Sequence, residues 1–470
     1  MKLLRRSNYL ILFILILGLM LSCEKDDNNA YIFGTNSVVN NLEKDENYSL
    51  FLEAIEKANM YSFLDGNSGT YTVLAPDNQA VQDFLNEKQL EDFDQLSEDE
   101  LFRLVNYHII DVLTPSENFI TGYTPTLAEV PINDSLQANL SLYVNNTIDE
   151  LKFNGQVEIT EKDIVVDNGM LHKINTVLDP PTLKTFMDAD ENLKAFYEKI
   201  TEENIATDFE DLLSNPDLKT TVLVPNQLAV ESFFNEQSLS VEELNNLYRY
   251  HLLDTLKLIQ SLNTGYYSTK ASEDYSGQNH ALDLYINTQA GLLLNGETSI
   301  VISDLMTING NIQVTDKVLN FPTLKTFITA DERLMEFYNA LSDSLQVDFT
   351  TLLEENVNEG NLAPFTVFAP DNEAFDDLIE NIFGEDPEDW QDIDPDEMED
   401  ILNLHIIPNL SLRKEDFSNQ TLQTLGESIQ LDADEMQLID PVQERSPISN
   451  GNIQSGNGVL HKIERVLQPY

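Results

Sequence analysis

Residues 365–375 are Phe-Thr-Val-Phe-Ala-Pro-Asp-Asn-Glu-Ala-Phe, a run that predicts a strand ending at a proline and a helix directly after it. Proline has no N–H to donate to a sheet, and Asp371 is a residue type that begins helices. Close variants occur at 71–78, Tyr-Thr-Val-Leu-Ala-Pro-Asp-Asn, and at 221–226, Thr-Val-Leu-Val-Pro-Asn. The chain therefore contains one structural unit three times.

Three histidines occupy one position of this repeat. His108, His251 and His405 lie about 150 residues apart, the length of an ordinary domain. Each follows by eleven residues a signal for the start of a helix, in which a cap residue and a glutamate satisfy free backbone N–H groups reciprocally. The three predicted capping boxes are Ser97 with Glu100, Ser240 with Glu243, and Asp394 with Glu397. Apolar residues recur at helical spacing in between, so we expect each histidine on the buried face of a helix.

Each repeat closes on a strand that begins at glycine. These strands are Gly-Met-Leu-His-Lys-Ile at 169–174, Gly-Asn-Ile-Gln-Val at 310–314 and Gly-Val-Leu-His-Lys-Ile at 458–463. No His-x-x-x-His or Glu-x-x-His pair accompanies the histidines, and a histidine on an apolar stripe is usually a hydrogen-bonded core residue. We predict no metal, no cofactor and no catalytic role for them. The predicted structural core histidines are His108, His172, His251, His405 and His461.

These motifs resemble those of the fasciclin (FAS1) domain family. The segment 366–375, the pair Tyr107-His108 and the run Asn-Gly-Met-Leu-His-Lys-Ile-Asn at 168–175 are similar to the two conserved blocks and the central Tyr-His of that family. The resemblance implies an α+β fold of three tandem fasciclin-like domains, each a β-wedge of two sheets wrapped by several α-helices. We place the domains at 39–180, 181–321 and 322–470.

The repeats differ at several motif positions. The second has Val224 before its proline and Gln313 in place of the closing histidine, and the third has Leu404 in place of tyrosine. A catalytic site must hold its groups in fixed mutual geometry, so divergence among three copies favours recognition over turnover. Prolines at the short joins between repeats predict limited bending there.

The amino terminus has the pattern of an export signal, in which basic residues precede a short apolar run. The run ends in Leu-Ser-Cys at 21–23, which resembles a bacterial lipobox, and Cys23 is the only cysteine. We predict a lipoprotein signal peptide at 1–22, then the lipidated cysteine and a polar tether at 23–38. The stretch Glu-Lys-Asp-Asp at 24–27 resembles the surface-export signal of Bacteroidota lipoproteins, so we expect an outer-membrane lipoprotein exposed at the cell surface.

The composition is strongly acidic, with 82 Asp and Glu against 26 Lys and Arg and a formal net charge of −56. A field of this sign repels nucleic acid, so we expect no nucleic-acid partner. The sequence contains no Gly-x-Ser-x-Gly elbow, phosphate-binding loop or dinucleotide fingerprint. We therefore predict a protein that is not an enzyme.

The family resemblance implies a binding scaffold. We predict a lipid-anchored adhesion or ligand-binding protein whose partners are a surface protein or polysaccharide and, through the anchor, the outer membrane. Asp163-Ile164 resembles the Asp-Ile pair that some animal fasciclin proteins present to integrins and is a candidate ligand contact; the alternative is an ordinary strand-edge aspartate. The alternative functions are a glycan-capture accessory lipoprotein of an outer-membrane polysaccharide-uptake system and an unrecognised hydrolase.

Overall fold

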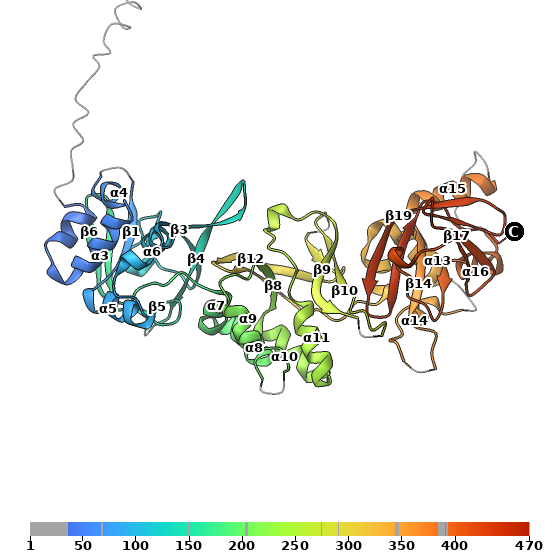
Figure 1. Ribbon diagram of the computed structural model, residues 1–470, viewed down its shortest axis with the longest axis horizontal. Helices are drawn as coiled ribbons and strands as arrows, with labels where there is room; N and C mark the ends of the chain where they lie inside the picture. The colour runs from blue at the N-terminus through green and yellow to red at the C-terminus, as the bar shows by residue number, and fades with distance from the viewer. Residues whose placement is uncertain are drawn as a thin grey trace, which may run out of the picture.

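The computed structural model contains three domains that follow one another in a row (Figure 1). The structure describes residues 36–469 apart from residues 67–68, 149, 203–204, 274, 290, 344–346, 359, 384–390 and 392. Every domain combines one set of strands with several helices, which confirms the predicted α+β class and the triplication. Within the described residues, no helix has both the length and the apolar character that crossing a bilayer requires.

Helices and strands follow nearly the same order in the three domains. The first domain contains α2 (Val38–Glu43), η1 (Glu46–Tyr48), α3 (Ser49–Lys57), α4 (Tyr61–Asp65), β1 (Tyr71–Pro76), α5 (Asn78–Glu87), η2 (Phe93–Gln95), α6 (Glu98–Tyr107), β2 (Ile109–Ile110), η3 (Ser116–Asn118), β3 (Gly122–Asn133), β4 (Leu136–Asn146), β5 (Leu151–Phe153), β6 (Val157–Val166) and β7 (Gly169–Ile174). The second contains α7 (Leu183–Ala189), α8 (Glu191–Ile200), α9 (Phe209–Ser214), β8 (Thr220–Pro225), α10 (Gln227–Glu236), α11 (Val241–Tyr250), η4 (Ile259–Ser261), β9 (Gly265–Ser272), β10 (Ala281–Asn287), β11 (Leu293–Leu294), β12 (Thr298–Thr307) and β13 (Gly310–Thr315). The third contains α12 (Leu324–Ala330), η5 (Glu332–Leu334), α13 (Met335–Asp343), α14 (Phe349–Leu352), β14 (Phe365–Pro370), α15 (Asn372–Phe383), α16 (Pro395–Asn403), β15 (Ile406–Ile407), η7 (Lys414–Asp416), β16 (Gln420–Gln423), β17 (Ser428–Asp432), β18 (Gln437–Ile439), β19 (Arg445–Ser455) and β20 (Gly458–Ile463).

One bent strand joins two sheets into a wedge in each domain. In the first domain the strand order is β2-β1-β7-β6-β5-β4-β3, with β1 parallel to β7. Strand β6 pairs with β5 at its start and with β7 along its length, and two register shifts bend it. Strands β12 and β19 have the same place in the other domains. One hydrophobic core lies between sheet and helices and a second lies within the wedge.

The glycine that begins each closing strand allows a close backbone approach. A Cβ on Gly169, at φ +151°, would lie 1.9 Å from the carbonyl oxygen of Tyr71 in β1. A Cβ on Gly458 would lie 2.2 Å from the carbonyl oxygen of Phe365. No other residue type fits there, because any side chain would push the parallel strands apart.

A buried asparagine precedes each of these glycines and connects helices to the sheet. Asn168 Oδ1 accepts the N–H of Val38 at 3.0 Å, and its Nδ2 donates to the carbonyl of Leu64 at 2.5 Å. Asn309 bonds in the same way to Leu183 and Leu213, and Asn457 to Leu324 and Leu353. These side chains satisfy backbone groups that helix ends leave free.

The predicted capping boxes form at Ser97 and Ser240. The prediction of a third box at Asp394 is wrong. The Asp394 carboxylate accepts the N–H of Asp396 at 3.0 Å, one residue before Glu397. A cap carboxylate can satisfy the N–H of the second helical residue as well as the third, and Pro395, at the first helical position, has none to offer.

Candidate functional site

The repeated histidines tie the end of one helix to the end of the same repeat. His108 follows α6 directly and is buried. Its Nδ1 lies 2.8 Å from the carbonyl oxygen of Leu104, and its Nε2 accepts the N–H of Leu178 at 2.9 Å. The same pair of bonds joins His251 to Leu247 and Leu319, and His405 to Ile401 and Leu467. Both ring nitrogens are therefore engaged within the protein.

The second histidine of the first domain holds a bulge in the neighbouring strand. The Nε2 of His172 lies 2.9 Å from the carbonyl of Thr114, and its Nδ1 accepts the N–H of Asp163 at 3.2 Å. In the second domain, Gln313 Oε1 accepts the N–H of Asp304 at 2.9 Å. His461 bonds in the same way as His172, to Leu412 and Asn452. An amide oxygen thus takes over the acceptor role of an imidazole nitrogen, which explains how the second repeat dispenses with this histidine.

The histidines are neutral and hydrogen-bonded on both sides of the ring. Burial lowers the pKa of His108, His251, His405 and His461 to about 4. It lowers the pKa of His172 as well. A ring whose two nitrogens are engaged has no lone pair left for a metal or a substrate proton. Among the described residues, no group of three or more His, Cys, Asp or Glu side chains could hold a metal ion.

The candidate ligand contact Asp163-Ile164 lies on the bulge of β6. Asp163 has φ +61°, and its carboxylate accepts from Ser116 twice, from the N–H at 2.7 Å and from the hydroxyl at 2.6 Å. The hydrogen bonds from Ser116 outweigh the opposing effect of burial and lower the pKa of this carboxyl group. Ile164 is half-buried and packs against the core. Contact of this pair with a ligand stays a prediction.

The predicted lipidation residue, Cys23, lies outside the described residues, as do the signal peptide at 1–22 and the tether up to residue 35. The lipid anchor and the outer-membrane location that follows from it stay predictions.

A repeated arrangement of polar side chains lies between successive domains. We call the contact between the first two domains the first joint and that between the last two the second joint. In the first joint, Tyr123 of β3 donates its hydroxyl hydrogen to Asp190 at 2.9 Å. In the second, Tyr266 of β9 donates to Asp331 at 2.9 Å, and Tyr285 donates to the same carboxylate at 3.3 Å. Asp190 and Asp331 each cap a helix of the following domain, so one domain hydrogen-bonds to the helix cap of the next.

A strand-to-side-chain bond recurs at the same place in both joints. Ser141 Oγ in β4 accepts the N–H of Met306 in β12 at 3.0 Å. Asp283 Oδ2 in β10 accepts the N–H of Gln454 in β19 at 2.8 Å. Figure 1 shows β4 extending toward β12 at the first joint. Equivalent residues of successive domains therefore meet equivalent partners.

Two Asn-Gly hairpins also belong to the joints. Asn154 and Gly155 both have positive φ, at +47° and +79°, which is the geometry of a tight hairpin turn. A Cβ on Gly155 would lie 3.0 Å from Ala189 Cβ in the next domain. At the second joint, a Cβ on Gly296 would lie 3.1 Å from Ala330 Cβ. Small residues on both sides let the hairpin lie against a helix.

The two joints differ in charge. Asp331 and Lys462 are buried and form an ion pair in the second joint. Burial opposes ionisation of Asp331, but the charge of Lys462 outweighs it and lowers the pKa of this carboxyl group. Burial raises the pKa of Asp283 to about 6. In the first joint, Val314 occupies the position of Lys462, and Ser141 occupies the position of Asp283. These two positions therefore carry no charge there.

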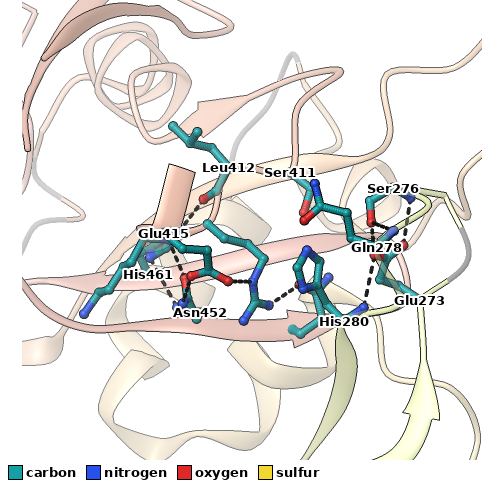
Figure 2. Close-up of polar contacts among 12 residues, drawn as sticks. Glu273, Ser276, Gln278, His280, Ser411, Leu412, Glu415, Asn452 and His461 are labelled. Carbon is teal, nitrogen blue, oxygen red and sulfur yellow. Dashed lines mark hydrogen bonds and ion pairs between the residues drawn. The ribbon is translucent and has the colours of Figure 1, made fainter. Parts of the chain in front are cut away.

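One loop adds a contact that is specific to the second joint. The buried Glu273 carboxylate accepts the N–H groups of Tyr275 and Ser276, each at 2.9 Å. Tyr275 donates its hydroxyl hydrogen to Ser411 of the third domain at 3.2 Å and accepts from Gln454 Nε2 at 2.7 Å. Figure 2 shows Glu273 and Ser276 of this loop joined by dashed lines. A buried carboxylate thus shapes a loop that reaches the next domain.

The third domain lacks the tyrosines of the joint. Strand register places Thr421 and Gln430 at the positions held by the tyrosine pairs of the first two domains. The pairs are Tyr123 with Tyr143 and Tyr266 with Tyr285. The sequence marks these joints with a Gly-Tyr dipeptide, which occurs in the first two repeats and is missing from the last.

Comparisons with known proteins agree on one family. The profile of the fasciclin domain matches residues 46–180, 191–322 and 332–469. Transforming growth factor-beta-induced protein ig-h3 of Oryctolagus cuniculus is 24% identical over 451 residues, covering 93% of this chain and 58% of that protein. Periostin of Homo sapiens is 23% identical over 445 residues, covering 92% of this chain and 47% of that protein. The chain thus spans about half the length of these curated relatives.

Among solved structures, this chain is similar to a FAS1 domain pair from the insect cell adhesion molecule Fasciclin I. It has 19% sequence identity and a TM-score of 0.38, and the match covers 59% of this chain and 98% of that chain.

Proposed function

This chain belongs to the fasciclin family, and we propose that it is a non-catalytic adhesion and ligand-binding protein whose three domains present their surfaces in a fixed array. The observation that carries the proposal is the repetition of one joint, with Tyr123 to Asp190 in the first and Tyr266 to Asp331 in the second. A stiff array allows several weak sites to engage one polymeric partner together, which raises the overall affinity without new chemistry.

The chemistry of the buried polar groups supports recognition over turnover. The repeated histidines use both ring nitrogens in structural bonds, and the carboxylates of the joints cap helices or accept backbone N–H groups. Hydrolysis would require a nucleophile, a base and an oxyanion site that converge in one cleft. The partner we propose is a polymer on a surface, either a protein or a polysaccharide.

The binding test uses residues 24–470, which lack the predicted signal peptide and lipidated cysteine, on a glycan array and in pulldowns with surface proteins. We expect saturable binding to a polymer, no hydrolysis of glycan and ester substrates, and weaker binding by a variant with loosened joints, Tyr123→Phe with Tyr266→Phe. Turnover that one point substitution abolishes would refute the proposal. Equal affinity of the loosened variant would refute the array and leave simple binding intact. Retention by polysaccharide alone would favour glycan capture in an uptake system.

We propose further that Cys23 carries a lipid that anchors the array to the outer membrane. The support is the Leu-Ser-Cys run after an apolar segment, and a cysteine with several acyl chains anchors stably. Cys23→Ala should leave the precursor uncleaved or release the protein from the membrane fraction. Unchanged processing and fractionation would refute the anchor. Protease added to intact cells tests surface display, since resistance there with digestion after lysis would place the protein on the periplasmic side.

A further inference from the structure

A groove of about 450 Å³ lies between the first two domains, beside the contacts of the first joint. Its walls come from α5, α6 and β3 of the first domain, and from the segments before β8 and after β12 in the second. Most of its lining is apolar, with Phe84 on one side and Ile308 on the other. Three cations also line it: Lys88, Arg103 and Lys219. A groove of this size and character is typical of small-molecule sites.

This concentration of positive charge is unusual in a chain with 82 acidic and only 26 basic residues. Two carboxylates line the same groove, Glu100 and Asp179, and both are engaged. Glu100 accepts from the N–H and hydroxyl of Ser97 as part of the helix cap, at 2.8 and 2.6 Å. Asp179 pairs with Lys88 at 2.6 Å. The cations outnumber the carboxylates by one.

The two remaining cations come from different domains and bond only to neutral carbonyls. Arg103 Nε donates to the backbone carbonyl oxygen of Glu129 at 3.3 Å, and Lys219 Nζ donates to that of Ile308 at 2.6 Å. Among the described residues, no carboxylate oxygen lies within 4.0 Å of either cation. Burial and then the charge of Arg103 lower the pKa of Lys219, so the two cations repel each other. An anion between them would remove that repulsion.

The second joint shows that the fold does not require these cations. Its equivalents of Lys88, Arg103 and Lys219 are Gln237, Asn246 and Pro364, as the helix caps and strand registers establish. The side-chain amide of Asn246 bonds to the backbone and donates to the carbonyl oxygen of Ser272 at 2.7 Å. At these three positions, positive charge therefore occurs in the first joint and not in the second.

We propose that this groove binds a small monoanionic amphiphile, an apolar body carrying one carboxylate. The carboxylate would lie between Arg103 and Lys219, and the apolar body would cover the wall formed by side chains such as Phe84. Arginine suits this role because its planar fork bonds a carboxylate at two points. The ligand's single negative charge balances the excess positive charge of the lining. This proposal does not depend on the proposed binding of a polymer, although the groove itself is formed by the first joint.

The test is calorimetric titration of the mature chain with 2-naphthoate and with its neutral analogue 2-naphthamide. We expect saturable binding of naphthoate at one site and at least about tenfold weaker binding of the amide, since a charge-assisted bond is lost. Arg103→Asn, which installs the residue type of the second joint, and Lys219→Gln should each weaken naphthoate binding at least about tenfold. Lys219→Arg keeps the charge and should retain binding.

A charge-matched control separates the site from the long-range field of the protein. Lys194→Gln removes one positive charge from the first turn of α8, where the partly exposed side chain does not line the groove, and should leave naphthoate affinity unchanged. Equal affinity for acid and amide would overturn the proposal. So would a lack of saturable naphthoate binding, or an equal loss in the Lys194→Gln control. Thermal melting of each variant confirms that loss of binding is not loss of folding.

Discussion

The Tyr266 hydroxyl donates to the Asp331 carboxylate across the second joint at 2.9 Å, the same distance that separates Tyr123 from Asp190 across the first. Both carboxylates cap a helix of the following domain, so each bond ties the preceding domain's sheet to the next domain's helices. The same positions also meet in the bonds of Ser141 to Met306 and of Asp283 to Gln454, so the two joints share a common set of contacts.

Removing the carboxylate of the second joint should cost more than removing that of the first. In Asp331→Asn, Lys462 loses its buried partner, and we expect the free energy of unfolding to fall by about 3–5 kcal/mol. In Asp190→Asn no buried charge loses its partner. The hydrogen bond from Tyr123 weakens, while the amide oxygen can still cap the helix, so we expect about 1 kcal/mol. Urea denaturation of the whole chain, with calorimetry to separate domain transitions, measures both. Equal losses at the two joints would contradict the buried pair.

The second joint should strengthen as the pH falls toward 6. Burial raises the pKa of Asp283 from 3.8 to about 6, so within this window the folded chain binds a proton that the unfolded chain does not. The resulting stabilisation is complete below the unfolded pKa and is lost as the pH rises through 6. Asp283→Ser copies Ser141 of the first joint and is the matched control. The stability difference between wild type and variant should grow in favour of wild type from neutral pH to pH 5; a constant difference would refute the assignment.

The histidines at the helix ends should contribute stability that acid removes. Burial holds the pKa of His108, His251 and His405 at about 4, below the ordinary 6.5, so the unfolded chain binds more protons in that window. Their stabilisation is present above 6.5 and falls as the pH drops toward 4. Replacing any one by alanine should cost about 1–3 kcal/mol, because Leu178 or its equivalent loses its acceptor.

Calorimetry at neutral pH measures these losses, and His280→Ala is the control, because His280 lies outside the repeated helix ends. We expect ligand binding by the two folded neighbouring domains to persist in each variant. Stoichiometric zinc binding that disappears in a folded histidine variant would show a metal role instead.

A single methyl group should disturb the second joint. Gly296→Ala would place a Cβ 3.1 Å from Ala330 Cβ at φ +78°, so the hairpin must move away from the helix. Gly291→Ala has a similar positive φ, +89°, with no atom within 4 Å, and reports the backbone strain alone. We expect about 1 kcal/mol for Gly291→Ala and a clearly larger loss for Gly296→Ala. Denaturant unfolding compares them, and equal losses would mean that the hairpin does not press on the helix.

The repeat and its local elements could be predicted from the sequence because near neighbours determine them. Proline ends β14, serine caps α6, and Asn154-Gly155 forms a tight turn, each through contacts within a few residues. The prediction of a capping box at Asp394 was wrong because two adjacent N–H groups compete for one short side chain. The local sequence does not determine which of them it accepts from.

The joints and the first groove were decided by tertiary structure. Tyr266 and Asp331 are 65 residues apart, and nothing in the pattern around either residue indicates the other. Arg103 and Lys219 likewise line one groove only because the first joint brings α6 close to the segment before β8. The sequence alone determined the number of domains, their fold class and the buried histidines, because hydrophobic periodicity and caps are local. The meeting of side chains from different domains depends on how finished surfaces pack, and only the folded chain contains that information.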